Sequence, residues 1–251
     1  MPPTKRLARI AGFLYLLVTI TGLFTLMYVP SKLFVRADPA ATVNNILAHE
    51  ALFRADIAVG LASELLFIAL VLVLYRLLKD VNRTLAGVMV LLVLLVAPLA
   101  FVGEAYNLAT LAFARGAQFL SAFDKPQRDA LATLVLGLDR EQTLVAEMFW
   151  GLWLLPLAVL VFRSGFLPRI LGGWLFVNGI AYVAISLTGI LMPGYLEIAN
   201  KIALPALMGE LALMLWLLVV GVRLRPATDK GKGAAPQRVG ADEGSGAGRP
   251  S

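Results

Sequence analysis

The sequence predicts an all-α membrane protein with six transmembrane helices and both termini in the cytoplasm. The chain of 251 residues is 59% hydrophobic and only 15% charged, which lies outside the usual range of a soluble domain. It contains six apolar runs, each near the roughly 20 residues that a helix needs to cross a bilayer. Lys and Arg residues gather at alternate ends of these runs, as expected when the chain crosses the membrane repeatedly.

One membrane domain, residues 1–225, contains all six predicted spans. They cover residues of about 9–29, 57–78, 85–106, 144–162, 170–192 and 202–222. The first apolar run is too long for the core of a signal peptide, and no A-x-A cleavage site follows it, so we expect it to be retained as a span. Pro98 predicts a kink in the third span.

Two connecting segments are expected to form helices on the membrane surface. Asp38 with Pro39, and Asp124 with Pro126, have the capping residue and first-turn proline of a helix start. Apolar residues follow each pair at roughly helical spacing. We therefore expect one short interfacial helix before the second span, and a second, separate one within residues 115–143, lying over the bundle.

The distribution of basic residues predicts the orientation. With both termini inside, 14 of the 22 Lys and Arg residues lie on the inner side and 8 on the outer side. The positive-inside rule then places both termini in the cytoplasm and residues 115–143 outside, in a multi-pass protein of the cytoplasmic membrane. Residues 226–251 supply much of this difference. They have almost no large apolar side chain, so we expect a disordered cytoplasmic tail.

Composition also limits the chemistry. The chain has no Cys and one His, His49, which excludes disulfides, thiolate metal sites, bis-His haem and multi-His zinc sites. Ser164 has no G-x-S-x-G context. We expect no catalytic residue, metal or cofactor. An intramembrane enzyme is therefore less expected than a transport-like protein or a non-catalytic membrane partner. The net charge of +6 lies at the ends of spans, so the expected partner is the lipid bilayer and not nucleic acid.

Four glutamates inside or at the edge of the apolar runs are the candidate ligand- or cation-binding residues: Glu64, Glu104, Glu147 and Glu210. Three of them lie roughly 18 to 24 Å along the helix from the Arg at its cytoplasmic end. No Lys or Arg lies deep in any span. A carboxyl group in such a place is neutral, holds a cation or borders water. Asp56 and Gly60 share a helical face with Glu64.

Two interpretations of these glutamates stay open. In the first, they line a polar cavity open to the outer side that binds a proton, a cation or a cationic solute, as in a transport-like protein. Glu64 and Glu210 then face a shared interior. In the second, they are protonated or hydrogen-bonded structural groups, with Glu104 and Glu147 at the membrane interface, and the protein is a non-catalytic membrane partner or regulatory subunit.

Other polar residues in the spans are expected to connect helices. Asn107, Asn178 and Tyr182 can supply hydrogen bonds between neighbouring helices. No two glycines lie four apart in the membrane domain, so the sequence contains no GxxxG pairing motif. The spacing of the glycines therefore does not indicate which helices pack together.

Four segments resemble a known family: FRAD at 53–56, LYRLLKDVNRTLA at 74–86, RSGFLPRILGGWL at 163–175 and GELALMLWLLVVGV at 209–222. They are similar to the bacterial membrane family catalogued as domain of unknown function 4386, over residues 8–225. The resemblance implies a multi-span bacterial membrane protein with no assigned activity and no established catalytic residues. Glu210 and Trp216 fall inside a matching segment. Members often carry an Arg early in the third span, where this chain has Leu and Val, so the resemblance supplies no basic partner for Glu104.

Overall fold

The computed structural model describes residues 3–35 and 38–222, and all regular structure in this part of the chain is helical. Six helical stretches there are long and apolar enough to cross a membrane. This confirms the predicted all-α fold with six candidate spans. The tail predicted at residues 226–251 lies outside the described residues.

Each predicted span falls on one of the six long stretches. Their bounds are α1 (Pro3–Leu23) continued through η1 (Phe24–Tyr28) and α2 (Val29–Leu33), then α4 (Glu50–Leu78), α5 (Arg83–Arg115), α6 (Lys125–Ser164), α7 (Arg169–Leu191) and α8 (Leu196–Val219). Short turns join them at one end of the bundle. There the Asn82 side chain caps α5 by accepting a hydrogen bond from Leu85 N at 2.9 Å. Gly165 ends α6 with a φ of 70°, which favours glycine.

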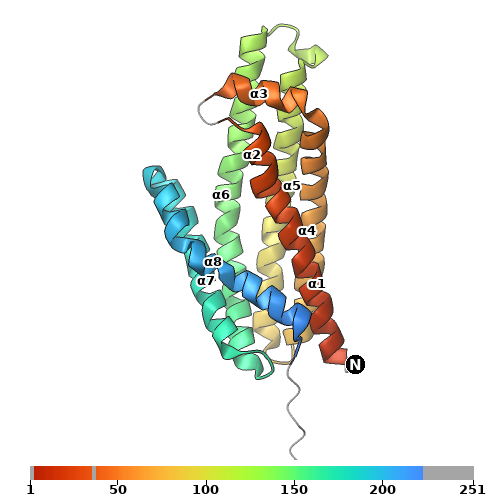
Figure 1. Cartoon of the computed structure of the whole chain (residues 1–251), viewed down its shortest axis with the longest axis vertical. Helices are drawn as coiled ribbons and strands as arrows, with labels where there is room; N and C mark the ends of the chain where they lie inside the picture. Colours follow the sequence, from red (N-terminus) through yellow and green to blue (C-terminus); the bar gives the residue numbers. More distant parts are fainter. Residues whose placement is uncertain (1–2, 36–37, 223–251) are drawn as a thin grey trace, which may run out of the picture.

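The six stretches form a ring in chain order. Each packs on the next, and α8 closes the ring by packing on α1. Figure 1 shows α8 crossing the front of the bundle to reach α1 near the N-terminus. We call the end that carries the N-terminus the inner end, and the opposite end, which carries α3 (Pro39–Ala48), the outer end.

The helix after Asp124 differs from the expectation. Asp124 is an N-cap as predicted: its side chain accepts a hydrogen bond from Gln127 N at 2.9 Å, and the Gln127 side chain accepts one from Asp124 N at 3.0 Å. The helix then runs for 40 residues, about 60 Å, straight into the fourth span. The prediction of a separate interfacial helix is wrong, because the polar residues at 139–143 are ordinary helix formers and do not break the helix.

The expected helix after Asp38 is confirmed. Asp38 accepts a hydrogen bond from Ala41 N at 2.9 Å and so caps α3. In Figure 1, α3 lies across the outer end of the bundle. Its buried face includes Val43 and Ile46, and it packs on α2, α4, α5 and α6. The apolar side of this helix therefore covers other helices.

A dense apolar core fills the inner part of the ring. It takes residues from all six long stretches, and its fully buried members include Trp153, Leu70, Leu74, Met89, Leu157 and Leu175. A smaller cluster at the outer end joins Val29, Leu33, Ile46 and Phe53 to Leu111, and among the described residues it takes nothing from α7 or α8. Toward the outer end, α7 still packs on α6, where the Ser186 hydroxyl donates to the Leu144 carbonyl oxygen at 2.8 Å.

Candidate functional site

Six acidic side chains on four helices lie in the ring, from the outer edge of the apolar core toward the outer end. They are Asp56 and Glu64 on α4, Glu104 on α5, Asp139 and Glu147 on α6, and Glu210 on α8. None of the six is paired with Lys or Arg in the described chain. The ion pairs recorded there join Glu50 to Arg54 and Arg115, Lys125 to Asp129, and Lys201 to Glu197. The ring interior therefore contains acidic side chains that have no basic partner in the described chain.

Glu210 has the fullest set of hydrogen bonds. Tyr15 donates from its hydroxyl to Glu210 Oε2 at 2.5 Å, and Asn178 Nδ2 donates to Oε1 at 3.4 Å. Tyr182 is a third hydrogen-bond partner of the same carboxyl group. These bonds join α8 to α1 and α7, which confirms the expected roles of Asn178 and Tyr182 between helices. A carboxylate has about four acceptor positions, so one of them stays free.

Asn178 is fully buried, with 0% of its surface exposed. Its Nδ2 reaches Glu210 and also the carbonyl oxygen of Leu207 at 3.5 Å. Its Oδ1 accepts no hydrogen bond from any described residue. A buried acceptor without a donor costs about 1 to 3 kcal/mol, so this oxygen is a strong site for a hydrogen-bond donor.

A pocket of about 530 Å³ opens between α6, α7 and α8 at the outer end. Glu147 lines it, together with Arg140, Thr143, Leu144 and Asn200. The Oε2 atom of Glu147 is buried and has no hydrogen-bond partner in the described chain. Tyr182 lies within electrostatic range of both Glu147 and Glu210, and its ring meets the Trp150 ring edge to face at 6.1 Å. Glu147 thus connects the pocket to the Glu210 group.

A second group contains Glu104, with Asp56 and Asp139 within its electrostatic range. The Glu104 carboxyl lies directly over Gly60 of α4, where any Cβ would collide with it. Asn107 Nδ2 donates to Glu104 Oε2 at 3.3 Å. This bond lies within α5, so the expectation that Asn107 connects two helices is wrong.

Asp139 of α6 and Asp56 of α4 are the other acidic members of this second group. An ideal Cβ on Gly103 would lie 2.8 Å from Asp139 Oδ1, so α6 reaches the α5 backbone there. Asp56 is only 8% exposed, and its Oδ1 has no hydrogen-bond partner among the described residues. The glycines at 60 and 103 therefore allow acidic side chains from three helices to approach one another.

Glu64 stands apart from both groups. Its Oε1 is buried without a partner, and within the described residues no hydrogen bond or ion pair joins it to Glu210. The shared interior of Glu64 and Glu210 stays a prediction. No three His, Asp or Glu side chains in the described ranges are arranged to hold one metal ion.

The family described as "Domain of unknown function (DUF4386)" matches residues 10–221, which include nearly all of the six long stretches. The chain belongs to the DUF4386 family. The match confirms the resemblance found in the sequence. No curated protein and no solved structure matches the chain.

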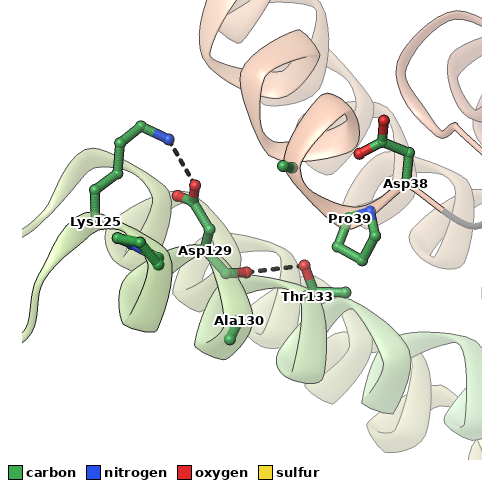
Figure 2. Close-up of a pocket in the computed structure, with 8 residues that line it drawn as sticks. Asp38, Pro39, Lys125, Asp129, Ala130 and Thr133 are labelled. Carbon is green, nitrogen blue, oxygen red and sulfur yellow. Dashed lines mark hydrogen bonds and ion pairs between the residues drawn. The ribbon is translucent and has the colours of Figure 1, made fainter.

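Another hollow on this DUF4386 protein lies at the outer end, between α3 and α6, with a volume of about 700 Å³. Figure 2 shows Lys125 paired with Asp129, at 2.6 Å, and the Thr133 hydroxyl donating to the Asp129 carbonyl oxygen at 2.8 Å. Asp38 caps α3 on the opposite wall. The charges of Lys125 and Asp129 offset each other, and none of the four predicted glutamates lines this hollow.

Single glycines bring helices together in this DUF4386 protein without a GxxxG motif. An ideal Cβ on Gly151 would lie 2.9 Å from Val183 N, and one on Gly179 would lie 2.8 Å from Gly151 O. The backbones of α6 and α7 therefore touch beside Glu147 and Tyr182. No local sequence pattern predicted this contact. None predicted that Tyr15 would join the Glu210 group or that Asp139 would join the Glu104 group.

Proposed function

We propose that this integral membrane protein binds a small cation inside the membrane, at Glu147 and Glu210, and admits it from the outer end between α6, α7 and α8. The observation that carries the proposal is the position of Glu147, which lines the outer pocket with a buried, unpartnered carboxyl oxygen. Tyr182 then lies within electrostatic range of Glu147 and hydrogen-bonds to Glu210. A path of polar groups leads from the pocket to the ring interior.

The charge of the site favours a cation. Glu147 on α6 and Glu210 on α8 have no Lys or Arg partner in the described chain. An ionised carboxylate removed from water requires a nearby positive charge, because desolvation otherwise favours the neutral form. Negatively charged carboxylates in a concave site also raise the local concentration of cations.

The apolar core supports access from one side. It packs residues from all six long stretches at the inner end, so the Glu210 group lies between this core and the outer pocket. A transport-like protein in an outward-facing state has this arrangement, and transport would require the inner core to open. Both termini in the cytoplasm, and residence in the cytoplasmic membrane, belong to the same proposal and rest on the distribution of basic residues.

Thermal melting of the detergent-solubilised protein tests the proposal. Inorganic cations and small ammonium ions would be titrated one at a time, at mildly acidic and mildly alkaline pH. Binding to the folded state alone adds about 2.7 kcal/mol at a concentration 100 times Kd, so one class should raise the Tm. Glu147→Gln and Glu210→Gln should remove that rise while keeping the fold, because Gln preserves the shape and a hydrogen-bonding head.

Glu197→Gln is the matched control. Glu197 lies on α8, like Glu210, but is 63% exposed and pairs with Lys201 at 2.9 Å. This variant should respond to cations as the parent does. Glu64→Gln and Glu104→Gln in the same series report whether the other predicted glutamates take part. A parent whose melting ignores pH and every cation, with all Gln variants equal to it, would contradict the proposal and favour a membrane partner or regulatory subunit.

A further inference from the structure

We infer that the cation is a protonated primary or secondary amine, whose N–H groups donate to Glu210 and to Asn178 Oδ1. The inference deepens the proposed function and rests on it, because it assigns a chemical class to the occupant of the same site. Its starting point is a buried amide oxygen without a donor, beside the Glu210 carboxyl group and aromatic rings.

The two acceptors are adjacent. Asn178 donates from Nδ2 to Glu210 Oε1 at 3.4 Å, so its own Oδ1 lies close to the same carboxyl group. This oxygen is fully buried and accepts nothing from the described residues. Glu210 already receives bonds from Tyr15, Tyr182 and Asn178, which leaves about one of four acceptor positions. An occupant that satisfies both acceptors must donate at least two hydrogen bonds and carry a positive charge.

A metal ion fits these acceptors poorly. Hard cations take six or more oxygen ligands, or a strict octahedron that keeps several waters. Among the described residues no three acidic or His groups converge on one point. An ammonium group needs fewer partners, because each N–H satisfies one acceptor. A quaternary ammonium ion has no N–H and would leave Asn178 Oδ1 without a donor. Leaving a buried acceptor unpaired costs free energy, so such an ion should bind more weakly.

Aromatic side chains adjoin the carboxyl group on two sides. Tyr15 comes from α1, and Tyr182 comes from α7 with Trp150 of α6 against its ring at 6.1 Å. Both tyrosines point their hydroxyl groups at Glu210, so their rings supply apolar surface beside the carboxyl group. The combination of one carboxylate, one amide oxygen and several rings suits an organic ammonium ion better than an inorganic one.

The outer pocket suits the rest of such a molecule. Beside Glu147 it has apolar walls formed by Leu144, Ile190, Pro193 and Leu196. An amine with a small apolar body can therefore place its body against these residues while its charge interacts first with Glu147 and then with Glu210. Arg140 and Glu141 also line the pocket and their charges offset each other, so Glu147 supplies its net negative charge.

Two probes with the same body provide the test: phenethylammonium and its N,N,N-trimethyl counterpart. Calorimetric titration of the purified full chain should give at least about tenfold tighter binding of the primary amine, because only its N–H groups satisfy the buried acceptors. Glu210→Gln and Asn178→Leu should abolish the preference, and Glu197→Gln should keep it. Since Asn178→Leu can fail to fold, the comparison of the two probes on the parent decides the inference without it.

The outcomes separate this inference from the proposed function. Equal affinity for the two probes, with a response that still depends on Glu210, would overturn the amine assignment and keep a cation site. The amine assignment is also overturned if sodium ions alone raise the Tm through Glu210 and phenethylammonium does not. If neither amines nor inorganic cations act through Glu210, both the inference and the proposed function are overturned.

Discussion

Replacing Gly151 with Ala should push α6 and α7 apart and weaken the candidate site together with the fold. The added methyl group would lie 2.9 Å from Val183 N and 2.8 Å from Val183 Cγ2. The backbone nitrogen belongs to α7 and cannot turn aside as the end of a side chain can. The helices must therefore separate for the new atom to fit.

The expected cost follows from two opposing terms. Overpacking a closely packed contact costs about 1 to 3 kcal/mol. Ala in place of Gly within a helix returns about 0.8 to 1.0 kcal/mol through its higher propensity. Gly173→Ala isolates the second term, because Gly173 is also helical and nothing lies within 4 Å of its absent Cβ. The two variants should therefore differ by about 1 to 3 kcal/mol, with Gly173→Ala the more stable.

The assay is reversible unfolding, or thermal melting, of both variants in the same detergent, followed by titration with phenethylammonium. Glu147 is one helical turn from Gly151, and Gly179, the other glycine of the contact, lies between Asn178 and Tyr182. A separation of the helices should thus weaken amine binding in Gly151→Ala and leave it unchanged in Gly173→Ala. If the two variants melt alike and bind alike, the argument from the glycine contact is refuted.

Two further predictions concern the orientation and the second acidic group. Single cysteines placed at positions 128 and 230 of this Cys-free chain should react with a membrane-impermeant thiol reagent in intact cells at 128 only; labelling at 230 and not at 128 would reverse the orientation. Gly60→Ala should change the free energy of unfolding by less than about 1 kcal/mol, because the atoms in its way are the mobile end of the Glu104 side chain. A loss well beyond this value in a denaturation experiment would mean that the neighbouring helices hold Glu104 rigidly.

The sequence by itself determined the class of the protein and the positions of its spans. Apolar runs of bilayer length and the capping residues Asp38 and Asp124 act locally, over a few turns of one helix, so they can be recognised without a structure. The same locality explains the error at residues 115–143. The polar residues before the fourth span indicate where the membrane ends, but a helix can continue through that boundary, and α6 does.

Only the tertiary structure decided which glutamates act together. Their depth follows from the chain, but their grouping depends on the ring order and on the rotation of each helix. Tyr15 and Glu210 are 195 positions apart and meet because α8 closes the ring on α1. Asp139 joins Glu104 because a missing Cβ at Gly103 admits it. Such contacts depend on fractions of an ångström between distant segments, which no pattern along the chain records.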